Sequence, residues 1–209
     1  KTLEEWGFEE EALPRSSPSH VAAGELDPER GIHVLVPTFR LPTMIHSRSA
    51  NSKHLMEISH ANPVWIHPDD ALMHGIEDAD LVRIETEIGH FVNRVWITEG
   101  LRPGVLACSH HMGRWRLESG PGSRWGSATV RFEDLPGGRI RLRLLEGVRP
   151  FKSKDPDSSR SWWSEAGVHQ NLAFPVQTDP VSGMHCWHQK VHLTKADATD
   201  QYGDVVVDP

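Results

Sequence analysis

The sequence has few cysteines and no long apolar run, and both absences exclude protein classes. It contains 2 cysteines in 209 residues, too few for a disulfide framework, so we expect two free thiols. No stretch of about 18 apolar residues is present that would span a bilayer, and no charged segment followed by an apolar one opens the chain as in a secretory signal. We therefore expect no membrane insertion by this segment, and the sequence indicates no particular compartment.

Positive charge is also scarce. The chain has 22 Lys and Arg against 29 Asp and Glu, for a net charge of −7. Non-specific binding to nucleic acid or to an anionic membrane needs a basic face, so neither partner is expected. Any anionic ligand must be met by a local group of basic side chains.

The familiar catalytic and nucleotide-binding motifs are missing as well. There is no Gly-x-Ser-x-Gly elbow for a nucleophilic serine. There is also no Gly-x-Gly-x-x-Gly and no Walker loop to hold nucleotide phosphates. Hydrolase chemistry is therefore not expected, and a phosphate ligand would have to be held in a less common way.

The length and the apolar content, 37% of 209 residues, fit one domain with its own core. The chain starts at Lys1 and opens with an acidic segment, so we interpret it as a fragment of a longer protein. Residues 1–30 form an N-terminal arm with a short helix expected over 2–12. Turn-forming residues follow that helix and break its periodicity.

After the arm, short runs rich in β-branched residues predict strands, and the chain is expected to be mainly β with short helices. The strands are expected over residues 32–36, 81–86, 91–98, 105–109 and 140–145. Helices are expected over 52–58, capped by Asn51 or Ser52, and over 67–75, where Pro68 and Asp69 favour a first turn. Residues 117–170 are expected to form a long excursion that carries the pair Trp162 and Trp163 and one hairpin, whose turn is Leu135-Pro136-Gly137-Gly138.

The segment from Thr38 to Asn51 concentrates groups suited to an anion. Arg40 and Arg48 can each present a guanidinium fork to phosphate oxygens. Ser47, Ser49 and Asn51 can bond to a ribose or a pyrophosphate, and His46 lies among them. An ordinary polar loop that caps the next helix would have the same composition.

Histidine is abundant, with 14 residues, so a metal site must be considered. Cys186 lies between His185 and His188, and Cys108 lies near His110; if the two segments meet, they would supply four zinc ligands. Structural zinc sites usually take paired ligands from each half, and only one cysteine stands in each half here. Half-buried histidines bonded to the backbone are the simpler interpretation.

Four segments, in this order, resemble the C-terminal dinucleotide-binding domain of the dimethyl sulfoxide reductase family of molybdopterin enzymes. They are Phe39 to Asn51 with its His-Ser-Arg-Ser run; Asn62-Pro63-Val64-Trp65-Ile66-His67-Pro68-Asp69-Asp70-Ala71 leading to Gly75-Ile76-Glu77-Asp78-Ala79-Asp80-Leu81-Val82; Gly100-Leu101-Arg102-Pro103-Gly104-Val105; and Asn171-Leu172 onward to Asp179-Pro180-Val181-Ser182-Gly183. The likeness covers most of residues 32–193. One departure is Phe174, where relatives more often carry threonine.

The resemblance implies a six-stranded double-psi β-barrel of the aspartate-decarboxylase-like type over residues 31–195, followed by a C-terminal tail over 196–209. It also implies a bis(molybdopterin guanine dinucleotide) cofactor with molybdenum or tungsten in the parent enzyme. The isolated domain would not be catalytic and need not retain the cofactor.

Carried over by position, the cofactor-binding residues implied by the resemblance fall into three groups. The first loop supplies Thr38, Arg40, His46, Ser47, Arg48, Ser49 and Asn51, and a strand end supplies His110 and His111. Asn171 would bond to a pterin or guanine edge. A late loop would close over the second dinucleotide with Thr178, Ser182, His188, Gln189 and Lys190, the last at a position resembling the family's usual basic residue.

The resemblance places the redox chemistry in the parent protein, on its cofactor. Expected partners are the remaining domains of the same chain and an iron–sulfur electron-transfer subunit. Formate, carbonyl compounds and oxyanions of arsenic, sulfur or nitrogen are all candidate substrates. Two other interpretations remain open: a double-psi barrel that acts as a protein-interaction module, and a zinc-binding domain.

Overall fold

The structure is a computed structural model, which describes residues 2, 5, 7, 19–41, 46, 52–59, 61–112, 130–144, 167–179 and 182–208. Several predictions lie outside these residues. They concern most of the helix over 2–12, the pair Trp162 and Trp163, and the predicted ligands Ser47, Arg48, Ser49 and Asn51.

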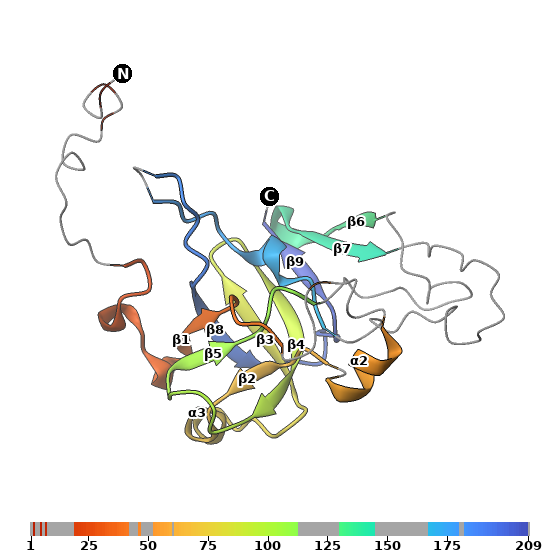
Figure 1. Cartoon of the computed structure of the whole chain (residues 1–209). Coiled ribbons are helices and arrows are strands. Elements are labelled where there is room, and N and C mark those ends of the chain that lie inside the picture. The colour runs from red at the N-terminus through yellow and green to blue at the C-terminus, as the bar shows by residue number, and fades with distance from the viewer. Residues whose placement is uncertain are drawn as a thin grey trace.

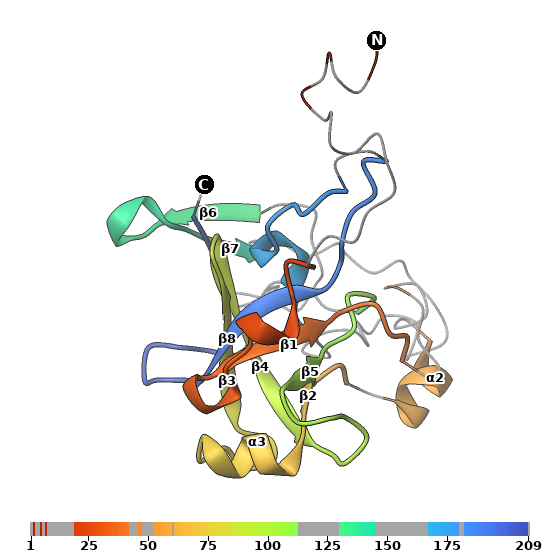
Figure 2. The same ribbon diagram turned by 90° about the vertical axis from the view of Figure 1, so that its left-hand side faces the viewer.

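Six strands close into a barrel (Figures 1 and 2). They are β1 (Ile32–Val36), β2 (Val64–Ile66), β3 (Leu81–Thr86), β4 (Gly89–Ile97), β5 (Val105–Ala107) and β8 (Gln189–Lys195). Their order is β2-β5-β1-β8-β3-β4, and a β2–β4 pairing closes the circle. β1 pairs with β5, and β2 with β4, in parallel, while the other neighbours are antiparallel. The predicted six-stranded barrel is confirmed.

The barrel interior is the hydrophobic core. Alternate residues point inward along each strand because successive side chains of a strand face opposite sides. Leu35, Ile84, Phe91, Leu106 and Leu193 are buried and belong to one cluster. This core holds the strand ends, and the loops that follow them, in fixed positions.

A smaller sheet extends from β4 beyond the barrel. β9 (Val205–Val207) pairs with β4 and with β7 (Ile140–Leu144), and β7 pairs with β6 (Val130–Asp134). β6 and β7 form the predicted hairpin, whose turn is the 3-10 segment η5 (Pro136–Gly138). Residues 196–209 were expected to be a tail, yet Val205 and Val206 are buried in this sheet. Three valines are too short a run to predict a strand by periodicity.

Short helices lie outside the barrel. α3 (Pro68–Met73) lies at the barrel end opposite the β6–β7 hairpin, as both views show. His67 caps α3, since its Nδ1 accepts a hydrogen bond from the Asp69 amide at 3.1 Å. α2 is Lys53–Ile58, with Ser52 at the N-cap but without a side-chain capping bond. No helix in the described part of the chain is long and apolar enough to cross a bilayer.

Part of the predicted arm packs on the barrel. It contains the 3-10 segments η3 (Ala23–Glu25) and η4 (Pro28–Arg30). His74 at the end of α3 donates from Nε2 to Pro28 O at 2.8 Å. Lys190 on β8 forms an ion pair with Glu25 at 2.7 Å.

The strand predictions differ in accuracy. The bounds of β1 and β3 agree with those expected, β4 begins two residues earlier than expected, and β5 ends two residues earlier. β2, β8 and β9 were not predicted as strands. β2 and β9 have only three residues each, and β8 begins with polar residues that had been assigned to the cofactor loop.

Candidate cofactor site

Two of the predicted loops meet at one end of the barrel. Because β1 and β5 run parallel and adjacent, their carboxyl ends lie at the same edge. The His110 amide donates to Pro37 O at 3.0 Å, and the hydroxyl of Ser109 donates to Phe39 O at 2.9 Å. Thr38 and Arg40, both exposed, are therefore next to the loop that carries His110 and His111.

Three predicted histidines form a cluster at this edge. The ring centroids of His110 and His111 are 3.9 Å apart, and those of His46 and His111 are 4.7 Å apart. His46 adopts a left-handed backbone with φ of 60°, which a non-glycine residue seldom does. The first loop and the β5 loop thus present their imidazoles to each other.

Hydrogen bonds set the orientation of two of these rings. His110 donates from Nδ1 to Pro37 O at 2.7 Å. The Ser109 hydroxyl donates its single proton to Phe39 O. Its oxygen can therefore only accept in the 3.1 Å bond to His111, so Nδ1 of His111 is the donor. In both rings Nε2 has no hydrogen-bond partner among the described residues, and it can donate to a ligand whenever the imidazole is protonated.

The charged groups that act on His111 are basic. Burial lowers the pKa of His111, and the neighbouring positive groups of His110, His46 and Arg40 lower it further. These basic groups disfavour the charged form of His111, and an anion beside it would reverse that effect. The end of β5 is therefore suited to bind a phosphate or another anion.

Buried amides hold the β5 loop in place. Asn62 donates to Ser109 O at 2.6 Å and to Met112 O at 2.7 Å, and it accepts from the Ser109 amide at 3.1 Å. Gln170 donates to Cys108 O at 2.7 Å. Asn62 lies in one of the segments quoted for the family resemblance, but no local pattern in the sequence assigned it this role.

A second feature lies beside the predicted ligand Asn171. It is exposed on the 3-10 segment η7 (Gln170–Ala173). The side chain of the adjacent Gln170 is buried, and its Oε1 has no hydrogen-bond partner among the described residues. Such an atom costs free energy unless a donor reaches it, so it indicates an open acceptor position.

The late loop contacts the histidine cluster through Trp187, which was not among the predicted site residues. Trp187 stacks on His110, with ring centroids 4.9 Å apart and an interplanar angle of 21°. A tryptophan between two polar stretches carried no local signal of this role. We call four side chains from three separate segments the ring stack: His46, His110, His111 and Trp187.

The predicted late-loop residues differ from one another in exposure and in bonding partners. Thr178, Ser182 and His188 are exposed, and Ser182 donates its amide to Asp179 Oδ1 at 2.6 Å. Gln189 is buried on β8 and donates to Trp187 O at 3.2 Å, so it supports the ring stack from inside. Lys190 is already paired with Glu25.

The candidate zinc ligands do not form a site. All five residues considered, Cys108, His110, His185, Cys186 and His188, are described, and among the described residues no group of three or more His, Cys, Asp or Glu is arranged to hold a metal. Cys108 is buried and Cys186 is exposed. Burial raises the pKa of Cys108 to about 12, so its metal-binding thiolate form is disfavoured.

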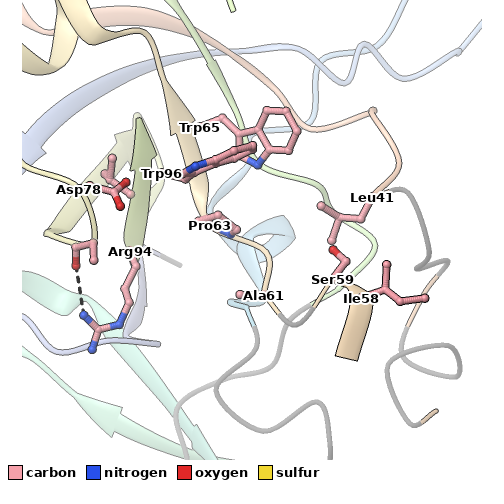
Figure 3. A pocket seen from close by; sticks show the side chains of 11 residues that line it. Leu41, Ile58, Ser59, Ala61, Pro63, Trp65, Asp78, Arg94 and Trp96 are labelled. Atoms are coloured by element: carbon pink, nitrogen blue, oxygen red, sulfur yellow. Dashed lines mark hydrogen bonds between the residues drawn. The ribbon is translucent and has the colours of Figure 1, made fainter. Parts of the chain in front are cut away.

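An apolar hollow lies on the outer side of β2 and β4 (Figure 3). Its volume is about 530 Å³, and its lining includes Leu41, Ile58, Trp65 and Trp96. Phe39 in the first loop packs on Trp65 with ring centroids 5.0 Å apart. The polar groups at its rim are engaged, since Arg94 donates to Ala79 O at 3.1 Å and Asp78 accepts from the Ile97 amide at 3.0 Å.

Comparison with known proteins agrees with this arrangement. Residues 35–134 match the family model described as "Molydopterin dinucleotide binding domain". A tetrathionate reductase polypeptide of Salmonella typhimurium is 34% identical over 140 residues, which cover 67% of this chain and 13% of the relative. Trimethylamine-N-oxide reductase of Haemophilus influenzae is 34% identical over 79 residues, which cover 38% of this chain and 9% of the relative.

A solved structure supports the fold. Acetylene hydratase from Pelobacter acetylenicus superposes with a TM-score of 0.53 at 15% identity, over 93% of this chain and 22% of that one. The chain spans between 7% and 13% of the length of the curated relatives it matches. Residues 35–134 of the chain therefore match the molybdopterin dinucleotide-binding domain family, and the chain is similar to reductases of the dimethyl sulfoxide reductase family of molybdoenzymes.

Proposed function

We propose that this domain grips the guanine form of the molybdopterin dinucleotide cofactor at the carboxyl ends of β1 and β5. The observation that carries the proposal is the group of basic side chains formed by His46, His110, His111 and Arg40. Because the chain has a net charge of −7, an anionic ligand needs a local positive site. This group of side chains supplies one.

The residues present fit such a cofactor in two ways. The pyrophosphate is an anion, and Nε2 of His110 and of His111 is left to donate to it when protonated. The pterin and guanine rings carry amino and ring N–H donors, and Gln170 Oε1 is a buried acceptor without a partner. When bound, the cofactor supplies the redox-active metal and its pterin ligands.

The protein's own contribution is positioning. Asn62 and Gln170 fix the β5 loop, and that loop orients the imidazoles before a ligand arrives. Donors that are already in place lose little free energy to reorganisation on binding. Arg40 and Thr38 complete the first loop, and Asn171 bonds to a heterocycle edge.

The remaining predicted ligands belong to the same proposal. Ser47, Arg48, Ser49 and Asn51 lie outside the described residues and are proposed as ligands of the pyrophosphate. Thr178, Ser182 and His188 line the second dinucleotide from the late loop. We assign Gln189 to support of Trp187, because it is buried and bonded to the Trp187 carbonyl. Lys190 would reach a phosphate after releasing Glu25.

We further propose that the parent protein is an oxidoreductase that uses molybdenum or tungsten. The support is the activity printed in the names of its relatives, which reduce tetrathionate, dimethyl sulfoxide or trimethylamine N-oxide. Other domains of the same chain and an iron–sulfur subunit would be its partners, and an oxyanion or oxide of sulfur, nitrogen or arsenic its substrate.

Amide-resolved NMR titration of the 209-residue chain with GDP tests the cofactor site. We expect GDP to shift amide resonances of residues 38–41, 46 and 108–112 at millimolar concentration, with smaller shifts for ADP. His111→Gln should weaken GDP binding by about fivefold or more, because it removes one charge-assisted hydrogen bond. His54→Gln, on the exposed surface of α2, is the matched control and should bind GDP as the wild type does.

Two outcomes would contradict the proposal. Absence of GDP binding, together with an unchanged spectrum of His46→Ala, would favour the protein-interaction module. Equal loss of affinity in His111→Gln and His54→Gln would show that the histidine cluster is not the binding site.

A further inference from the structure

The ring stack continues from the histidine cluster to the surface. His110 lies between His111 and Trp187, with centroid distances of 3.9 Å and 4.9 Å. The angles of 35° and 21° bring the three rings toward parallel planes. His185 contacts Trp187 at 4.8 Å and 76°, in an edge arrangement. The indole is therefore stacked on His110 and in a T-shaped contact with His185.

Trp187 remains open to solvent despite these contacts. The residue is 39% exposed, although its indole is stacked on His110. An indole that served only to fill the core would be buried, since burial of its apolar area is what stabilises the fold.

The segment around Trp187 is held by backbone bonds on both sides. The Cys186 amide donates to Gln177 O at 2.6 Å, and His185 donates from Nδ1 to the same oxygen at 3.1 Å. His20 donates from Nε2 to His188 O at 2.6 Å, and Gln189 donates to Trp187 O. The indole is thus fixed in position before any ligand binds.

Charge is distributed unevenly around Trp187. On its inner side lie the basic groups of the histidine cluster. On the β8 side a hollow of about 240 Å³ is lined by Lys190 and His20 but also by Glu25 and Glu87, and Lys190 is paired with Glu25. A ligand phosphate is favoured on the histidine side, which leaves the indole for an uncharged ring.

We propose that Trp187 is a stacking platform for a fused two-ring heterocycle, the chemistry that guanine and pterin share. The inference rests on the proposed function and adds a residue that selects for a planar ring next to the phosphate site. Stacking on an aromatic side chain contributes to nucleobase binding in a manner tolerant of base identity. The ring would lie on the exposed part of the indole while the anionic group contacts His110 and His111.

The test measures three probes against three variants by NMR titration of the 209-residue chain. The probes are GMP, unsubstituted pterin and inorganic pyrophosphate. The variants are Trp187→Leu, Trp187→Phe and Trp96→Leu, the last a matched control because Trp96 is 43% exposed on the apolar hollow. Trp187→Leu should weaken binding of GMP, pterin or both by about fivefold or more. Trp187→Phe should recover part of that loss, and Trp96→Leu should lose nothing.

Pyrophosphate separates stacking from a general disturbance of the site. Its affinity should be unchanged in Trp187→Leu, because it has no ring to stack. An equal loss for pyrophosphate and GMP would overturn the stacking role and show that Trp187 acts only by holding His110. Unchanged GMP and pterin affinity in Trp187→Leu would overturn it as well, while leaving the proposed function intact. If the wild type bound none of the three probes, the proposed function and the platform would both fail.

The probes also identify the ring. Loss confined to GMP would assign the platform to the guanine, and loss confined to pterin would assign it to the pterin. Either result supports the platform.

Discussion

Asn62 is the residue on which the geometry of the site most depends. Its side chain makes three bonds to the backbone of Ser109 and Met112, and it is 1% exposed. We expect Asn62→Ala to lower the free energy of unfolding by about 2–4 kcal/mol, because it leaves buried backbone groups without partners. Urea unfolding would measure this, with Asn171→Ala as the exposed control, expected within about 0.5 kcal/mol of the wild type. A loss equal to that of the control would show that the loop does not need Asn62.

At the scale of elements, the attachment of the outer sheet depends on a close backbone approach at Gly89. A Cβ at this position would lie 2.2 Å from Val206 O, which only glycine avoids. Gly89→Ala should therefore push β9 away from β4, lower the free energy of unfolding by about 1–3 kcal/mol, and expose the amides of Val205–Val207 to hydrogen exchange. Gly24→Ala, with open space around it, is the control. Full amide protection of β9 in Gly89→Ala would contradict the pairing.

At the scale of the whole molecule, buried histidines make stability depend on pH. Burial lowers the pKa of His33 and of His90 below the usual 6.5. Above pH 6.5 both are neutral in the folded and unfolded chains. Below it the unfolded chain takes up protons that the folded chain does not, so the free energy of unfolding falls toward acid, by at most about 1.4 kcal/mol per pH unit per histidine. Urea unfolding between pH 7.5 and 5.5 should show this fall, and His33→Gln should make it shallower, whereas His54→Gln should not. An identical slope in His33→Gln would contradict the assignment.

Much of the local structure was predictable from the sequence. The bounds of β1 and β3 agree with the expected ones, and the Pro68 start of α3 agrees with its capping residues. The Leu135–Gly138 stretch correctly indicated the turn of the β6–β7 hairpin. These features depend on neighbours within a few residues, through side-chain alternation and capping, and such signals are present in any short window of sequence.

The site was predictable only in part. Resemblance to a family pointed to His46, His110 and His111, and the structure brings these rings together. It did not point to Trp187, nor to the roles of Asn62 and Gln170. Each of these acts on residues at least 47 positions away or in another loop, and no short pattern records such a contact.

The sequence by itself determined that the chain is mainly β, acidic and without common nucleotide motifs, because composition and local periodicity are properties of the chain alone. Tertiary structure decided how six strands close into a barrel, and that a three-valine tail segment is a core strand. It also decided that rings from three segments form one stack. These outcomes depend on the register and packing of segments far apart in the chain, and that packing is fixed only when the whole core forms.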